Sequence, residues 1–405
     1  MEAIEMIFWS SLSILFYTYI GYGGITFVIA KLSRRTNPDD LDFKDLPEIT
    51  HVIAAYNEED LIKDKIINCY NLEYPKSKIK TIVVADGSTD KTVEIVKRYP
   101  WVQLYFSPER KGKLAAVDRV MKEVDTPITV FSDANSMINF DGIRKMVRHF
   151  QLNTVGGVAG EKVVINEEKD DAASAGEGIY WKYESFLKKL DYQVHSVVGA
   201  AGELFAVRTH LFETPAKDAL IEDFLITMSI TEKGYRVAYE PEAKAKEYAS
   251  ANIGEELKRK VRISAGGLQS VWKLRSLLNP FKHGLLTFQY VSHRAIRWTL
   301  APIALFLMLI TSTVLITTGS DVYSTLLLGQ LGFYGLSVVG YFAEHQKIRL
   351  KALFVPFYFT FMNLSVYIGL IKLITGEFNV KWEKAGRRVA SGVKPAIAEL
   401  SMVRS

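Results

Sequence analysis

Cysteine is nearly absent from this sequence, whose 405 residues include only Cys69. A single cysteine excludes a disulfide within the chain, so cysteine usage gives no support for an extracellular folded domain. A large excess of charge of one sign is also missing, because 50 lysines and arginines face 45 aspartates and glutamates, for a net charge of +5. The basic residues gather beside apolar segments, which favours a membrane surface over nucleic acid as their partner.

Apolar residues, in contrast, are concentrated toward the two ends of the chain. Residues 1–32 and 298–376 are strongly apolar, whereas the stretch between them has the composition of a soluble protein. The sequence therefore predicts five parts. These are an N-terminal transmembrane helix (1–32), a soluble α/β domain (33–250), basic interfacial helices (251–297), a transmembrane region (298–376) and a basic C-terminal tail (377–405).

The first apolar segment predicts the side of the membrane on which the soluble domain lies. Residues 7–30 carry no charge; two glutamates precede them, and Lys31, Arg34 and Arg35 follow. The positive-inside rule places the N-terminus outside and the soluble domain in the cytoplasm of an integral membrane protein. A buried helix of a soluble protein is the alternative.

Three further apolar segments, 298–318, 322–342 and 352–375, create a conflict in this topology. Three crossings leave the C-terminus outside, although the tail and the 347–351 loop are basic and favour the inside. Either one segment is re-entrant or interfacial, with the segment around Pro356 as the leading candidate, or the tail breaks the charge rule.

Two amphipathic stretches, 255–278 and 285–298, come just before these segments and predict helices that lie in the membrane interface. His293, Arg294 and Arg297 belong to the second stretch. Arginines that snorkel toward the membrane surface explain this group without any functional role.

Between the apolar ends, short apolar strands alternate with amphipathic helices. Strands are expected at 49–55, 79–85, 102–106, 128–131, 155–165, 203–207 and 235–239, and helices at 60–71, 89–98, 113–123 and 141–150. This βαβ rhythm predicts a mainly parallel sheet, which binds its ligand at the carboxyl ends of the strands.

Polar residues follow three of these strands at the point where each strand ends. Tyr56 and Glu58 follow the first strand, Asp86 follows the second, and Asp133 and Asn135 follow the fourth. The carboxyl ends of parallel strands meet at one edge of a sheet, so these side chains are expected to converge there. A turn with a helix N-cap is the alternative explanation for the residues around Asp86.

Four more motifs lie further along the chain. They are the basic run that ends at Lys113, the glycine-rich segment around Gly202, the acidic pair Glu222 and Asp223, and the pair Gln269 and Trp272. Taken singly, each has a structural explanation: a solvated basic turn, a tight turn before a strand, an acidic helix N-terminus, or a membrane-surface helix. Taken in this order, the motifs resemble those of the family 2 glycosyltransferases, with the GT-A fold and membrane helices of the synthases of cellulose, hyaluronan and poly-N-acetylglucosamine.

The resemblance implies a GT-A fold, a Rossmann-like mixed sheet, with a site for a nucleotide-sugar donor. Tyr56 and Glu58 correspond to the residues that hold the nucleotide base, and Asp86 corresponds to the acid that binds the base or the ribose. Lys113 corresponds to the lysine beside the diphosphate, where a helix start and a glycine favour an anion.

The resemblance also implies a metal cofactor, Mg²⁺ or Mn²⁺. Asp133 and Asn135 stand where the family has an Asp-x-Asp motif, whose metal bridges the two phosphates of the donor. Asn135 departs from this pattern, because an amide oxygen can bind a metal but carries no charge. Asp133 is therefore expected to carry more of the metal binding.

Asp223 corresponds to the catalytic base of the family. A nucleoside diphosphate leaves as an anion that the metal stabilises, so only the acceptor hydroxyl has to lose a proton. One carboxylate is enough for this reaction, and a single displacement inverts the anomeric centre. Glu222 is expected to take part by orienting the acceptor.

Gly202, Gln269 and Trp272 correspond to residues on the acceptor side. Processive members carry a Gln-x-x-Arg-Trp motif, whereas a valine precedes Trp272 here. The expected function is inverting transfer from a nucleotide sugar, with a UDP-sugar as the expected donor, to a growing glycan at the cytoplasmic membrane face.

Two alternatives to this function stay open. One is the addition of a single sugar to a lipid-linked acceptor, and the other is a membrane scaffold without catalytic activity. Intact Asp86, Asp133 and Asp223 argue against the scaffold. The expected partners are the nucleotide-sugar donor, a glycan or lipid-linked acceptor and the lipid bilayer, and no nucleic-acid partner is expected.

Overall fold

A computed structural model of the chain describes residues 1–33, 45–165, 172–248, 250, 252–346 and 351–378. These residues form two compact units. The sheet unit contains the described residues of 45–165 and 191–248, and the helical unit contains those of 1–33, 172–190 and 250–378. The five-part division expected from the sequence stays a prediction.

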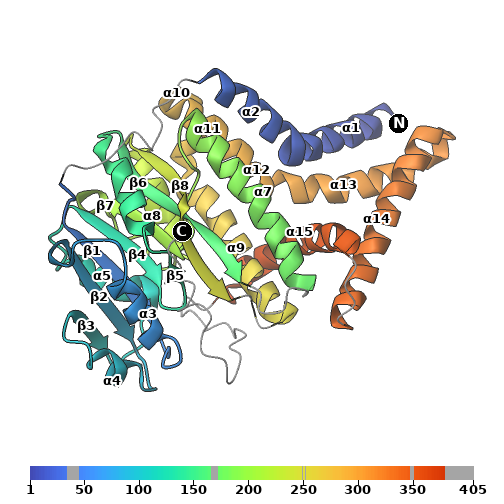
Figure 1. Cartoon of the computed structure of the whole chain (residues 1–405). Helices are drawn as coiled ribbons and strands as arrows, with labels where there is room; N and C mark the ends of the chain where they lie inside the picture. Colours follow the sequence, from blue (N-terminus) through green and yellow to red (C-terminus); the bar gives the residue numbers. More distant parts are fainter. Residues whose placement is uncertain (34–44, 166–171, 249, 251, 347–350, 379–405) are drawn as a thin grey trace. The chain divides into compact units, whose positions relative to one another are not determined.

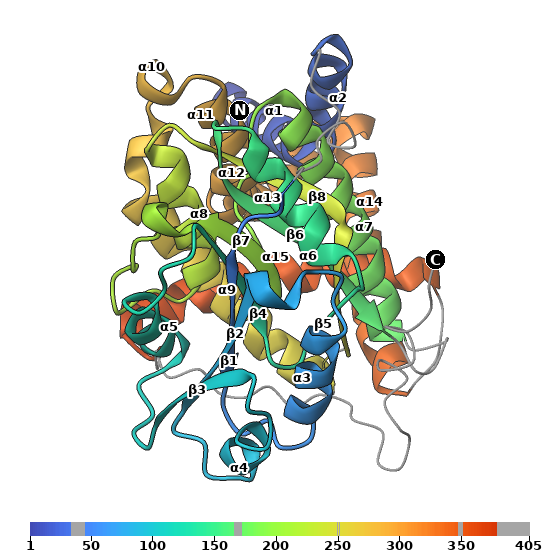
Figure 2. The same ribbon diagram turned by 60° about the vertical axis from the view of Figure 1, so that its left-hand side comes forward.

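The sheet unit is built around one eight-stranded sheet with the order β3-β2-β1-β4-β7-β6-β8-β5. The strands are β1 (Ile49–Ala55), β2 (Ile79–Asp86), β3 (Val102–Ser107), β4 (Ile128–Asp133), β5 (Met137–Ile138), β6 (Val155–Ile165), β7 (Leu204–Arg208) and β8 (Arg236–Tyr248). Figures 1 and 2 show β1, β2, β3 and β4 side by side in this sheet.

The sheet is parallel throughout one half, whereas parallel and antiparallel pairs are mixed in the other half. Strands β3, β2, β1 and β4 are parallel, as the βαβ rhythm indicates. In the other half, β7 runs antiparallel to both β4 and β6, while β6 and β8 are parallel. The sheet is therefore mixed, as the fold class that the resemblance implies requires.

Helices cover both faces of the sheet because alternate strand residues are apolar on each face. On one face, α3 (Ile62–Tyr70), α4 (Thr92–Val96) and α6 (Gly142–Arg148) pack against a core that includes Ile49 and Ile53. On the other face, a second core places α5 (Lys113–Met121) and α8 (Glu222–Glu232) against strand residues such as Val52 and Phe131. The starts of α3, α4 and α5 follow the strand ends where the polar motifs lie.

The helical unit contains ten α-helices among its described residues. They are α1 (Glu2–Phe16), α2 (Tyr22–Leu32), α7 (Ala172–Val194, as far as residue 190), α9 (Ile253–Lys273), α10 (Pro280–His283), α11 (Leu285–Tyr290), α12 (Ile296–Trp298), α13 (Leu300–Leu315), α14 (Asp321–His345) and α15 (Lys351–Thr375). Four segments are long and apolar enough to cross a membrane: Glu2–Leu32, Leu300–Thr318, Asp321–Glu344 and Ala352–Thr375. The basic tail and the 347–350 loop of the predicted topology lie outside the described residues, so the side of the C-terminus stays a prediction.

The snorkelling explanation for His293, Arg294 and Arg297 is wrong. The His293 side chain is fully buried, and the arginine side chains are only 11–12% exposed. All three pair with Glu184 of α7. Charged side chains turn inward here because a buried carboxylate, more than one hundred positions earlier in the chain, attracts them.

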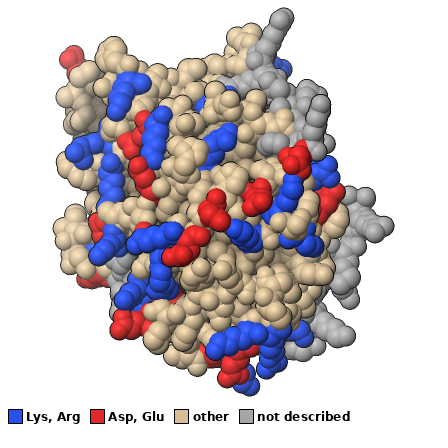
Figure 3. Space-filling view, turned by 90° about the vertical axis from the view of Figure 1, so that its left-hand side faces the viewer, with Lys and Arg blue, Asp and Glu red and all other residues tan. Residues whose placement is uncertain are grey.

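The surface of the described residues is mixed in charge. Figure 3 shows lysines and arginines interspersed with aspartates and glutamates over one face. This distribution follows the near balance of charges in the sequence.

Candidate active site

The loops after β1 and β2 hold each other in place. Asn57 adopts a left-handed backbone conformation with φ of 52°, which asparagine tolerates better than most residues. Its Oδ1 accepts a hydrogen bond from the Thr89 amide at 2.8 Å, and the Glu58 amide donates to Thr92 Oγ1 at 2.8 Å. These bonds fix the loop that carries Tyr56 and Glu58.

Asp86 organises the basic run before α5. Its Oδ2 accepts hydrogen bonds from the backbone amides of Lys111 and Gly112, at 2.8 and 2.6 Å. Gly87 is required beside it, because φ is +71° and a Cβ there would lie 2.6–2.9 Å from Arg110 atoms. Asp86 Oδ1 is buried; it makes no hydrogen bond to the described residues, but it forms an ion pair with Arg119 Nη2 at 3.7 Å.

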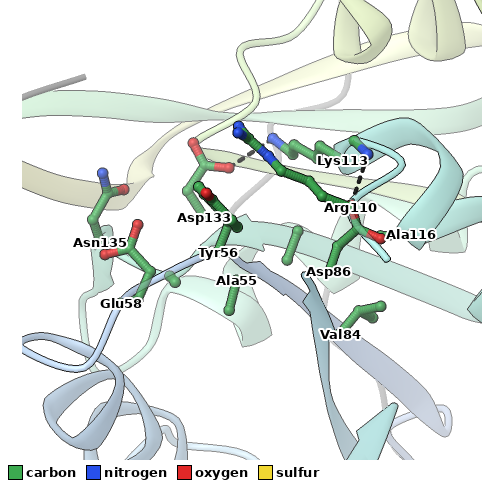
Figure 4. Close-up of a pocket in the computed structure, with 13 residues that line it drawn as sticks. Ala55, Tyr56, Glu58, Val84, Asp86, Arg110, Lys113, Ala116, Asp133 and Asn135 are labelled. Carbon is green, nitrogen blue, oxygen red and sulfur yellow. Dashed lines mark hydrogen bonds and ion pairs between the residues drawn. The ribbon is translucent and has the colours of Figure 1, made fainter. Parts of the chain in front are cut away.

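A pocket lies at the carboxyl ends of β1, β2 and β4 (Figure 4). Its lining includes the predicted residues Tyr56, Glu58, Asp86, Lys113, Asp133 and Asn135, together with Arg110. The Arg110 guanidinium lies 3.8 Å from the centre of the Tyr56 ring. A planar aromatic group beside a guanidinium plane suits a nucleotide base, which stacks on either.

Lys113 connects this pocket to the acidic pair at the start of α8. Its Nζ donates to Asp133 Oδ1 at 2.6 Å and lies 3.5 Å from Glu222 Oε1. Burial alone would lower the pKa of Lys113, but the charges of Asp133, Glu222 and Asp223 outweigh burial and raise it. Lys113 is therefore a permanent cation that faces three carboxylates.

Asp223 has the electrostatic properties of a general base. Burial, followed by the charge of Glu222, raises the pKa of its carboxyl to about 7, although Lys113 opposes the shift. A base whose pKa lies near neutral pH combines an available carboxylate with useful basicity. Gly202 leaves the space in front of it open, since a Cβ there would lie 3.2 Å from both Asp223 Oδ2 and Lys113 Nζ.

Asp133 and Asn135 can supply oxygen ligands to a divalent cation. Asn135 is 6% exposed, and its Oδ1 has no hydrogen-bond partner among the described residues. The described residues contain no group of three or more histidine, cysteine, aspartate or glutamate side chains placed to hold a metal. Two oxygen ligands fit a cation that takes its other ligands from phosphates and water, as Mg²⁺ commonly does.

The structure separates the predicted site residues into two sets. Asp223, Glu222 and Gly202 adjoin the pocket through Lys113. Gln269 and Trp272 lie on α9 of the helical unit, where Trp272 is 72% exposed. Their acceptor role stays a prediction. Arg110 was not among the predicted site residues, although its place in the same basic run as Lys113 was a usable signal.

Comparison with known proteins agrees with this geometry. The family model "Glycosyl transferase family 2" matches residues 50–214. A poly-beta-1,6-N-acetyl-D-glucosamine synthase of Staphylococcus aureus is 27% identical over 243 residues, 56% of each chain. The enzyme of that name from Staphylococcus epidermidis is 25% identical over 286 residues, 66% of each chain. The match thus spans little more than half the length of the Staphylococcus aureus relative.

A solved structure shares the fold. The mannosyltransferase PcManGT from Pyrobaculum calidifontis, in complex with GDP-Man and Mn²⁺, superimposes with a TM-score of 0.71 at 21% identity. The superposition covers 93% of this chain and all of that one. Residues 50–214 therefore match the glycosyltransferase family 2 model, and the chain has a GT-A-like fold.

Proposed function

We propose that the protein transfers a sugar from a nucleotide-sugar donor, with inversion, to a growing glycan at the cytoplasmic face of the membrane. The observation that carries this proposal is the position of the Asp223 carboxyl, and its raised pKa of about 7 supports the role of a base. It lies beside Lys113, which also contacts Asp133 in the donor pocket. A base and a diphosphate site that share one lysine suit displacement of a nucleoside diphosphate.

The pocket residues bind and orient the donor in this proposal. Tyr56 and Arg110 take the base, while Glu58 and Asp86 hold the nucleoside. Lys113 contacts the diphosphate, and Asp133 and Asn135 hold Mg²⁺ or Mn²⁺. When bound, this metal neutralises charge on the departing diphosphate. A UDP-sugar is the proposed donor.

Asp223 takes the proton of the acceptor hydroxyl while the hydroxyl oxygen forms a bond to the anomeric carbon. The bond from that carbon to the diphosphate breaks on the opposite side, so the anomeric centre inverts. Glu222 orients the acceptor, and Gly202 leaves room for it. Gln269 and Trp272 contribute further acceptor contacts.

The same reaction can also use a second class of acceptor, a lipid-linked one. The curated relatives are named as synthases of a polymer, which favours a growing glycan. The sequence departs from the Gln-x-x-Arg-Trp motif before Trp272, which favours the addition of one sugar to a lipid-linked acceptor.

The test is release of nucleoside diphosphate by the purified full chain. A panel of UDP- and GDP-sugars is supplied with Mn²⁺, with and without membrane lipid. We expect release with at least one donor, and mass spectrometry of the product distinguishes a polymer from a single addition. No release with any donor under either condition would contradict the proposal.

A further inference from the structure

The helical unit buries one carboxylate among several cations. Glu184 of α7 is 1% exposed. Its Oε1 lies 2.5 Å from Arg294 Nη2, and its Oε2 accepts from Arg297 Nη1 at 3.1 Å. His293 Nε2 is 3.3 Å from the same carboxylate. Two guanidiniums and an imidazole therefore share this one buried carboxylate.

Arg297 has the donors that an anion needs. Its Nε and Nη2 atoms are buried, and neither has a hydrogen-bond partner in the part of the chain that the structure describes. These two atoms lie on the same side of the guanidinium and form the fork that binds two oxygens at once. The Nη1 atom, on the other side, already binds Glu184. This pair of donors matches the two oxygens of one oxyanion.

Three tyrosines lie near the Arg297 guanidinium. The Tyr183 ring lies 5.7 Å from the Arg297 guanidinium, and its hydroxyl donates to the Tyr19 carbonyl at 2.9 Å. Tyr180 and Tyr19 also interact electrostatically with Arg297. Tyrosine combines apolar surface with a hydroxyl, which is typical of sites where an apolar chain meets a polar group.

Two π-helical turns lie beside the cluster. One spans Tyr17–Gly21 between α1 and α2, and the other spans Val291–Ala295 before α12. The Tyr17 hydroxyl and Ser292 Oγ, one from each turn, are 2.6 Å apart. Single π-helical turns often occur at functional sites, because they reorient side chains within a helix. The second turn supplies His293 and Arg294 to the cluster.

The place of Arg297 in the chain indicates the source of the oxyanion. Arg297 comes three positions before Leu300, where a segment apolar enough to cross a membrane begins. A ligand that reaches it from the bilayer would carry an oxyanion on an apolar chain. Lipids supply this combination as phosphate esters, either in a phospholipid headgroup or in a prenyl phosphate.

We propose that Arg297, with Arg294, His293 and Tyr183 around it, forms a binding site for the phosphate group of a lipid. The Nε and Nη2 atoms of Arg297 donate to two phosphate oxygens. The site does not depend on the proposed transfer reaction, since binding is measured without donor or metal.

The experiment compares matched lipids on the purified full chain in detergent, by native mass spectrometry. One pair is a polyprenol and its monophosphate, and the other is a diacylglycerol and the corresponding phosphatidylglycerol. Inorganic phosphate forms a third arm. We expect the phosphate-bearing member of at least one pair to bind at least about tenfold more tightly than its partner. The pair that shows the gain identifies the source, and a gain with inorganic phosphate alone would contradict a lipid ligand.

Two variants test the fork itself. Arg297→Lys keeps the charge opposite Glu184 but removes the bidentate donor pair, and Arg297→Gln removes both. We expect each to lose the gain, whereas the exposed Arg275→Gln keeps it. Thermal melting confirms that the variants fold; if they do not, the wild-type lipid pairs alone decide. Equal binding within both pairs, or a gain that survives in both folded Arg297 variants, would overturn the proposal.

Discussion

Each unit buries a cluster of charged side chains, but carboxylates outnumber cations in one cluster and cations outnumber carboxylates in the other. In the sheet unit, Lys113 faces the carboxylates of Asp133, Glu222 and Asp223. In the helical unit, Glu184 faces two guanidiniums and an imidazole. A buried charge without a partner lowers the free energy of unfolding. The difference agrees with the ligands that we propose, a metal with its diphosphate at the first site and an anion at the second.

Loss of the base gives the largest expected effect. Asp223→Asn removes the proton acceptor while keeping the size of the side chain, so turnover falls by about 10³-fold. Donor binding stays nearly unchanged, because the donor contacts lie in the pocket lined by Tyr56 and Asp86. Nucleoside diphosphate release and calorimetric donor binding measure the two quantities. Turnover that survives the substitution would remove Asp223 as the base.

Loss of the Glu184 carboxylate in the helical unit is expected to lower the stability of the protein. Glu184→Gln leaves two buried guanidiniums without their counterion, which costs about 3–5 kcal/mol. The melting temperature of the full chain in detergent is expected to fall accordingly. An unchanged melting temperature would show that the arginines find other partners.

Asp223→Asn is the matched change in the sheet unit, and its effect on stability has the opposite sign. Because burial raises the pKa of Asp223 to about 7, the native protein loses stability as pH rises from about 4, the unfolded value, to about 7. The asparagine variant avoids this loss. It is expected to melt above the wild type at pH 8, with a difference that shrinks toward pH 5. A difference that grows toward low pH would contradict the assignment.

The same pKa predicts how the reaction depends on pH. Asp223 acts as a base only when ionised, so turnover falls by about tenfold for each pH unit below about 7. Rates at saturating donor between pH 5.5 and 8 test this, with donor binding measured at each pH as the control. A flat profile over this range would exclude a base with this pKa.

The smallest expected effect concerns the metal. Asn135→Asp restores a second charged oxygen beside Asp133 and should strengthen Mn²⁺ binding by about threefold to tenfold. The Mn²⁺ concentration that gives half-maximal diphosphate release measures the change, with Asn135→Ala as the opposite control. If the aspartate variant needs as much Mn²⁺ as the wild type, Asn135 does not bind the metal.

Short-range patterns predicted much of the sheet unit. Strands 49–55 and 155–165 were placed correctly to the residue, because buried strands bounded by turns form distinct apolar runs. The antiparallel direction of β7 was not predicted, since it depends on strand order rather than on local residues. Likewise, the motifs predicted which side chains meet in the pocket, but not that Lys113 pairs with Asp133.

Helix α7 was not predicted because its buried face is partly charged. Tyr180, Tyr183, Glu184, Leu187 and Lys188 recur at helical spacing. A periodicity search for apolar residues alone misses such a face. For the same reason, His293, Arg294 and Arg297 resemble surface residues until Glu184 is placed beside them.

The anomeric configuration of the product tests the central claim most directly, because one base and one displacement allow only inversion. Once a donor and an acceptor are found, the coupling constant of the new anomeric proton by NMR reports the linkage. An α-linked donor is predicted to yield a β-linked product. An α-linked product would contradict a single displacement assisted by Asp223.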